Sequence, residues 1–116
     1  MMTDEIFSSG VRDAGDLAGV FEFDGRTGYF YLYNTNISDH RAILAHIHIM
    51  SINPDFSERD ISIRWTDDQE KVGLFIRGVL WAVFDARDHR KYGGGYAPGR
   101  STTVPPEVTR EFAPVS

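Results

Sequence analysis

The segment between residues 20 and 33 constrains the fold of this chain more than any other. Large apolar residues alternate with other side chains on both sides of a run of turn formers, Asp24-Gly25-Arg26-Thr27-Gly28. Such alternation is typical of strands with one buried face, and a glycine can take the positive φ that a short loop needs. We therefore expect a β-hairpin with four inward side chains, Phe21, Phe23, Phe30 and Leu32. Its other face carries Tyr29, Tyr31 and Tyr33.

A second patterned segment runs from residue 61 to residue 84. One face of an expected strand carries Ile61, Ile63 and Trp65, and alternation returns between residues 72 and 77. Gly78 permits a tight reversal, and residues 79–84 are apolar on both faces. We expect a three-strand meander whose last strand is covered on both sides, with Trp81 and Phe84 on opposite faces.

Residues 38–50 can be interpreted in two ways. Ser38 is placed as a helix N-cap and Asp39 would favour the first turn. One interpretation is a short helix to about Ala45 that changes to a strand over residues 46–50, where isoleucines alternate with histidines. The other is a continuous helix to Met50, so the choice between helix and strand for residues 42–50 stays open.

These segments predict a single α+β domain over residues 1–116. Its centre would be an antiparallel sheet of about five to six strands, hairpin plus meander, with one or two short helices. Residues 1–17 would form an N-terminal arm, residues 18–85 the sheet core, and residues 86–116 a Gly/Pro-rich C-terminal loop. Within that loop, Pro105-Pro106-Glu107 can open one last short helix, since proline is tolerated in a first turn.

Composition limits the surroundings and partners of the chain. The formal net charge of -5 argues against nonspecific binding to nucleic acid or to anionic membranes. The start of the chain lacks the features of a signal peptide, and no apolar run approaches the roughly 20 residues of a membrane span. Because there is no cysteine, we expect a reducing, cytoplasmic location.

Four stretches of the sequence, FEFDGRTGYFYLYN, ISIRW, VGLFIRG and WAVFD, together resemble a small family of bacterial domains of unknown function known mainly from structural genomics. The resemblance covers residues 18–85. It implies a single α+β domain with an antiparallel sheet and no established catalytic residues, so no residue role is carried over from it.

The two histidines in the stretch AHIHIM are the first candidate site. In a strand, His46 and His48 point the same way and can offer two imidazoles to one metal, but a site needs a third ligand and usually a fourth. The favoured interpretation places Ile47 and Ile49 in the core and the histidines toward solvent or a partner. We therefore expect no metal and no cofactor. The alternative is a small-ligand or metal-dependent enzyme that uses this pair, with Tyr31 or Arg64 as polar helpers.

The tyrosine row is the second candidate site. Exposed aromatic rows are uncommon on monomers, and tyrosine gives a large contact area at low entropy cost. The alternative is that a helix or the N-terminal arm covers the row from within. With no nucleophile arrangement in the sequence, we expect no catalytic residues and a non-catalytic protein-binding domain, immunity- or adaptor-like and homodimeric. The expected binding surface consists of Tyr29, Tyr31, Tyr33, His46, His48 and Arg64.

Overall fold

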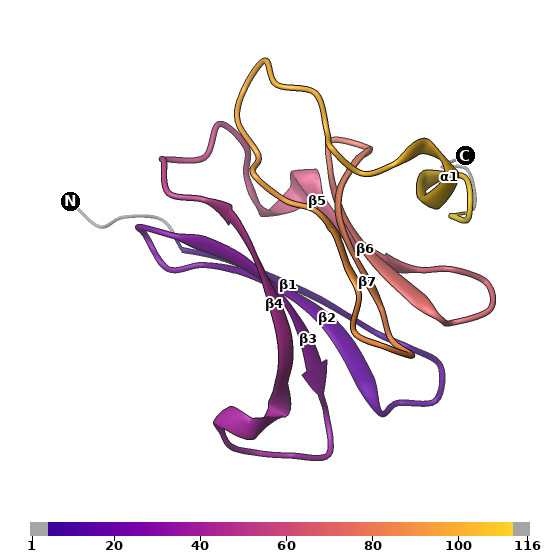
Figure 1. Ribbon diagram of the computed structural model, residues 1–116. Coiled ribbons are helices and arrows are strands. Elements are labelled where there is room, and N and C mark those ends of the chain that lie inside the picture. Colours follow the sequence, from indigo (N-terminus) through magenta and orange to yellow (C-terminus); the bar gives the residue numbers. More distant parts are fainter. Residues whose placement is uncertain (1–4, 113–116) are drawn as a thin grey trace.

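The computed structural model describes residues 5–112 and contains, within them, two four-stranded antiparallel sheets (Figure 1). The first sheet is a meander of β1 (Ile6–Val11), β2 (Leu17–Phe23), β3 (Gly28–Asn34) and β4 (Ile43–Met50). The second is a meander of β5 (Ile61–Trp65), β6 (Lys71–Ile76), β7 (Val79–Asp85) and β8 (Lys91–Gly93). The helical elements are two single 3-10 turns, η1 (His40–Ala42) and η2 (Glu58–Asp60), and the short helix α1 (Pro106–Thr109).

The predicted α+β class with five to six strands is therefore wrong, because the described chain is nearly all β and has eight strands. Two strands lie where the sequence predicted an arm and a loop. β1 pairs with β2 from Ile6↔Phe23 to Val11↔Ala18, and β8 pairs with β7 over three residues. The inward positions of β1 after Ile6 are Ser8 and Gly10, so this strand lacks the apolar alternation that would have identified it.

The prediction of a helix with Ser38 as its N-cap is also wrong. Asp39, not Ser38, is the N-cap residue, and its carboxylate accepts a hydrogen bond from the Arg41 backbone N–H at 2.9 Å. The capped segment is a single 3-10 turn, after which β4 begins at Ile43. An N-cap forms one residue later than predicted, but the β-branched and apolar residues that follow pair with β3 and end the turn.

The hairpin prediction is confirmed by β2 and β3. Gly25 has a φ of 100°, and the Asp24 carboxylate accepts hydrogen bonds from the backbone N–H groups of Arg26 and Thr27, both at 2.9 Å. This Asx-type turn fixes the register. The four inward side chains of the hairpin are at most 1% exposed.

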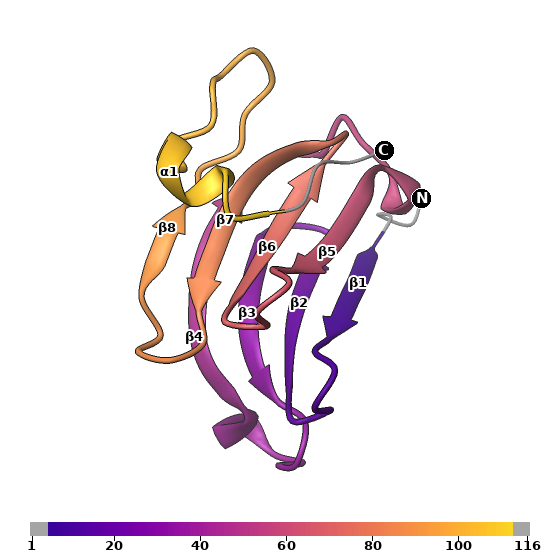
Figure 2. The same cartoon turned by 90° about the vertical axis from the view of Figure 1, so that its right-hand side faces the viewer.

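The two sheets pack face to face and enclose the main core (Figure 2). From the first sheet, Phe30 stacks on Phe84 of β7 with ring centroids 5.0 Å apart. Gly19 allows β2 to approach β6, because a Cβ at this position would lie 2.6 Å from the Val72 Cγ2. The architecture is thus a two-layer sandwich built from two consecutive meanders.

The outer face of the second sheet is covered by residues 104–112, which we call the C-terminal cover. Phe75 of β6 and Val83 of β7 form a smaller core with Val104, Val108 and Phe112. This confirms that β7 is buried on both sides. The four-residue α1 is part of this cover, and among the described residues no helix is long and apolar enough to cross a membrane.

Trp81 and Phe84 do not lie on opposite faces, as the sequence predicted. The β6–β7 register shifts between Leu74↔Ala82 and Phe75↔Leu80, which leaves Trp81 as an extra residue in β7. Such a bulge reverses the alternation of side chains along the strand. Both Trp81 and Phe84 therefore belong to the core between the sheets.

One edge of the sandwich is closed by a contact between β1 and β5. The Trp65 indole N–H donates a hydrogen bond to the Gly10 carbonyl oxygen at 2.9 Å. Gly10 permits this approach, since a Cβ there would lie 2.8 Å from the Ile63 carbonyl oxygen. The close approach of the β1 and β5 backbones that joins the two sheets thus requires a residue without a Cβ at position 10.

We expect Trp65→Phe to lower the free energy of unfolding by about 1 kcal/mol, because it removes the hydrogen bond to Gly10 and keeps most of the ring. Urea denaturation measures the change. Ser62→Ala, at an exposed position of the same strand, should stay within about 0.5 kcal/mol of the wild type. An unchanged Trp65→Phe variant would show that this indole contributes only packing.

Candidate functional site

The tyrosine row and the histidine pair lie together on the outer face of the first sheet. Tyr29 pairs with His48 and Tyr31 with His46 across β3 and β4. We call these residues, with Tyr33, the tyrosine–histidine face. The structure thus brings together five of the six residues that the sequence singled out.

Tyr29 is the centre of an aromatic cluster on this face. Its ring stacks on Tyr31 with centroids 5.8 Å apart and an interplanar angle of 24°. The imidazoles of His46 and His48 approach it edge-on at 5.7 and 5.5 Å. These contacts leave the tyrosines half-buried and the histidines exposed, so the cluster is ordered yet open to solvent.

Register explains why side chains from four strands share this face. Three rows cross the sheet: Phe7, Glu22, Tyr29 and His48; Ser9, Val20, Tyr31 and His46; Val11, Ala18, Tyr33 and Ile43. Successive side chains of a strand alternate between faces, so these rows are the outward counterparts of the core residues.

On the β1 and β2 side of the outer face of the first sheet, the side chains other than Ser9 and Glu22 are apolar. Phe7 and Val11 are 55% and 54% exposed, values that are high for large apolar side chains. Together with Ala18, Val20 and Tyr33 they line a shallow groove of about 310 Å³. Sequence reasoning missed this side because β1 itself was missed.

Glu22 is the one carboxylate in the three rows, which hold no lysine or arginine. Burial, first of all, and then the negative charge of Glu22 raise the pKa of Tyr31. The Tyr31 hydroxyl therefore stays neutral well beyond neutral pH. The face presents aromatic, apolar and hydroxyl groups with little formal charge.

Arg64 does not join this face. It lies in β5 on the outer side of the second sheet, with its guanidinium carbon 4.9 Å from the centroid of the Phe75 ring. Arg64 therefore packs beside Phe75 of β6 on the second sheet, away from the tyrosine–histidine face.

His46 and His48 gain no further metal ligand from the described part of the chain. Between residues 5 and 112, no group of three or more His, Cys, Asp or Glu side chains is arranged to hold a metal ion. The His48 Nε2 lies 2.8 Å from the Ser51 Oγ, within hydrogen-bonding distance. The arrangement places aromatic rings, imidazoles and hydroxyl groups together on one outward face.

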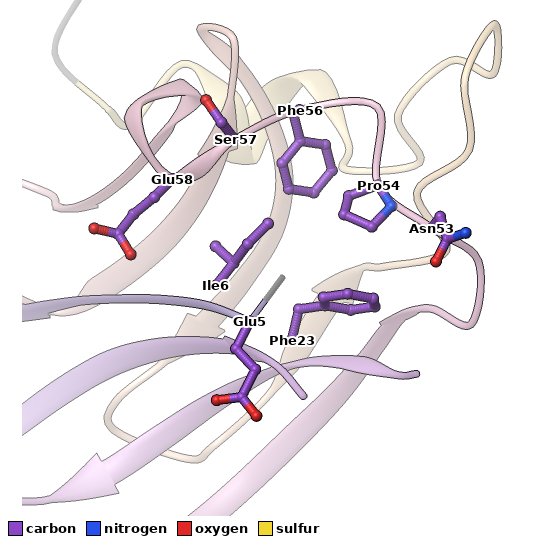
Figure 3. Close-up of a pocket in the computed structure, with 8 residues that line it drawn as sticks. All are labelled: Glu5, Ile6, Phe23, Asn53, Pro54, Phe56, Ser57 and Glu58. Atoms are coloured by element: carbon purple, nitrogen blue, oxygen red, sulfur yellow. The ribbon is translucent and has the colours of Figure 1, made fainter. Parts of the chain in front are cut away.

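A separate cavity of about 380 Å³ opens at one end of the sandwich (Figure 3). It lies where β1 begins, β2 ends and the loop between β4 and β5 passes over both. Its apolar lining consists of Ile6, Phe23, Pro54 and Phe56, and its polar lining of Glu5, Asn53, Ser57 and Glu58. No sequence pattern pointed to this cavity, because its residues come from three separate segments.

Comparison with curated proteins and with solved structures found no match to this chain. The family model described as "Uncharacterized protein conserved in bacteria (DUF2251)" matches residues 1–107. This agrees with the resemblance seen in the hairpin and the meander. Since the match covers most of its length, the chain belongs to this uncharacterised bacterial family.

Proposed function

We propose that this protein is a non-catalytic protein-binding domain, immunity- or adaptor-like, that docks through the tyrosine–histidine face. The observation that supports this proposal is the continuity of the face. The aromatic cluster around Tyr29 adjoins an apolar groove whose rim residues, Phe7 and Val11, are more than half exposed. Aromatic and apolar side chains in one open patch are the usual composition of a protein interface centre.

The chemistry of the face favours docking over catalysis. Tyrosine rings supply contact area with few rotatable bonds, and their hydroxyls can bond at the rim. The Ser51 hydroxyl lies 2.8 Å from the His48 Nε2, but within residues 5–112 no carboxylate bonds to the His48 imidazole to complete a catalytic triad. The proposed setting is the cytoplasm, which the cysteine-free composition supports.

The first partner that we propose is a second copy of the chain. With a formal net charge of -5, two copies repel each other over most of their surfaces. The tyrosine–histidine face and its groove carry Glu22 as their only carboxylate, so two such faces can meet with little repulsion. Four strands at about 4.8 Å spacing give a width of about 19 Å, which suits an interface at the smaller end of the usual 1,200–2,000 Å².

A dimer closed through this face keeps the acidic remainder of both copies exposed. Such a surface would speed association with a basic protein partner, as an immunity- or adaptor-like role requires. If the dimer binds a basic partner in this way, the rate of their association should fall steeply as salt is added.

We expect the wild type to scatter light as a species of about twice 13.1 kDa at high micromolar concentration. Tyr29→Ser combined with Tyr31→Ser should yield a folded species near 13.1 kDa, because the substitutions remove the centre of the interface. If the double variant does not fold, an obligate dimer predicts that the melting temperature of the wild type rises with its concentration.

The matched control is Ile52→Ser combined with Val79→Ser. These residues are 47% and 45% exposed but lie outside the tyrosine–histidine face. This control should remain dimeric. A wild type of 13.1 kDa at high micromolar concentration would exclude the homodimer.

A further inference from the structure

The cavity at the end of the sandwich is bounded by residues of the main core. Ile6, Phe23 and Phe56 all belong to that core and are 5%, 1% and 7% exposed. Their side chains border a hollow of about 380 Å³, which is within the size range of small-molecule sites. Apolar side chains that border an empty space lack dispersion contacts on that side. A ligand that fills the space can supply those contacts.

The loop that borders the cavity is fixed by contacts of Phe56 and Asp55 with residues outside the cavity lining. The ring of Phe56 packs against Phe21 and Tyr96, with centroid distances of 6.3 and 5.2 Å. Next to it, the Asp55 carboxylate accepts a hydrogen bond from the Tyr96 hydroxyl, and the Asp55 carbonyl accepts one from Arg77. These contacts fix the loop above the hollow.

A second anchor holds the other end of this loop. The Ser57 backbone N–H donates to the Asp60 carboxylate at 2.9 Å, and the Asp60 N–H donates to the Ser57 carbonyl at 2.9 Å. This capping arrangement starts the 3-10 turn η2. Because both ends of the loop are tied, a ligand would find the site largely preformed.

The charges at the cavity have one sign. Its two ionisable residues are Glu5 and Glu58, and within residues 5–112 neither carboxylate takes part in an ion pair or hydrogen bond. Figure 3 shows Glu58 to the left of Ile6 and Glu5 below it, both with their carboxylates directed away from the hollow, and Asn53 and Pro54 to the right. Unpaired carboxylates at the rim of a cavity that two phenylalanines also line favour a cation, since aromatic faces also attract positive charge.

We propose that this cavity binds a small organic ammonium compound. The apolar part of the ligand lies between Ile6, Phe23 and Phe56, and its ammonium group lies on the side of Glu5 and Glu58. The volume of the cavity suits a small molecule, its apolar walls suit an apolar group, and its two carboxylates favour a positive charge. The site is at the end of the sandwich, not on the outer face of the first sheet, so it is independent of the proposed docking function.

The probes that test this proposal are 2-phenylethylamine, phenyltrimethylammonium, 2-phenylethanol and 3-phenylpropionate. They share a phenyl group and differ in charge. In titrations followed by amide chemical shifts, we expect the two cations to bind with dissociation constants near or below about 1 mM. The alcohol should bind several-fold more weakly and the carboxylate should not bind. The shifts should centre on the loop at residues 53–58.

Glu5→Gln combined with Glu58→Gln is expected to weaken binding of both cations by roughly 3- to 10-fold, the effect of removing exposed charge partners, and to leave the alcohol unchanged. Glu107→Gln, an exposed carboxylate of α1, is the matched control and should bind as the wild type does. Equal affinity for amine and alcohol, unchanged binding by the double variant, or no binding of either cation at 5 mM probe, about five times the expected dissociation constant, would each overturn the proposal.

Discussion

Phe84→Ala is expected to lower the free energy of unfolding by about 3–5 kcal/mol, the usual result of emptying a fully buried aromatic site. Phe84 is 0% exposed and stacks on Phe30 of the opposite sheet. The substitution removes the ring that joins the two layers at their centre, and neighbouring side chains cannot refill the space without strain. Such a loss is a large part of the 5–15 kcal/mol that typically stabilises a domain.

Trp81→Ala should have a similar effect, for a related reason. Trp81 is 5% exposed, and its ring meets Tyr96 edge-on with centroids 4.7 Å apart. Because the bulge turns Trp81 into the same core as Phe84, both substitutions damage the inter-sheet layer and leave the C-terminal cover in place.

Equilibrium urea denaturation followed by circular dichroism measures both losses. Val79→Ala, in the same strand at a position that is 45% exposed, is the control and should stay within about 0.5 kcal/mol of the wild type. A Trp81→Ala variant that also stays within about 0.5 kcal/mol of the wild type would mean that this side of β7 is not buried.

Strands were predictable from the sequence where their own residues carry a clear pattern, and were missed where contacts with distant residues determine them. The hairpin of β2 and β3 was predictable because alternation and an Asx-type turn at Asp24 agree. β1 was not, because Gly10 is small for a tertiary reason, the close approach of β5. β8 is only three residues long and contains a glycine, so it carries no pattern at all.

The candidate site was predictable in its parts but not in its assembly. Alternation alone placed the tyrosines on one face of a strand and the two histidines on one face of another. That Tyr29 faces His48 depends on the register of β3 with β4, which includes shifts between Gly28 and Tyr29 and between Leu32 and Tyr33. The sequence could not show that Arg64 lies in the other sheet, because strand alternation does not say to which sheet an outward residue belongs.

The C-terminal cover is attached by charge as well as by apolar packing. The Lys71 Nζ lies 3.6 Å from the Asp85 carboxylate and 2.9 Å from that of Glu111, which follows α1. Arg87 also donates to Asp85, through its guanidinium at 2.8 Å and its backbone N–H at 2.9 Å. The side chains of Lys71 and Asp85 are only 8% and 5% exposed, so these interactions are poorly screened by solvent.

This arrangement gives Asp85 an acid-sensitive contribution to stability. Hydrogen bonds from Arg87, outweighing the effect of burial, lower the pKa of Asp85 from 3.8 to about 2. A carboxyl group with a lowered pKa in the folded state stabilises that state above its unfolded pKa. The contribution is therefore complete above about pH 4 to 5 and is lost as the pH falls toward 2. Its size is roughly 2 kcal/mol.

Asp85→Asn is accordingly expected to destabilise the protein by roughly 2 kcal/mol or more at pH 7, because it also leaves the buried Lys71 ammonium with Glu111 alone. The difference from the wild type should shrink between pH 4 and pH 2, as measured by urea denaturation at several pH values. Asp16→Asn is the control. The pKa of Asp16 is also lowered to about 2, by Arg12, but its side chain is 40% exposed and solvent weakens the pair, so its loss should be smaller.

Lys71→Met distinguishes the contribution of the Lys71–Asp85 ion pair from that of the hydrogen bonds between Arg87 and Asp85. Without Lys71, Asp85 keeps its hydrogen bonds from Arg87, and no buried cation is left behind. Replacing a buried ionic group by an apolar one of similar size is often tolerated, so Lys71→Met should cost less than Asp85→Asn at pH 7 and should retain most of the acid-dependent loss. If instead Lys71→Met were the more damaging change, or removed the pH dependence, the pair with Lys71 and not the bonds from Arg87 would stabilise the Asp85 carboxylate.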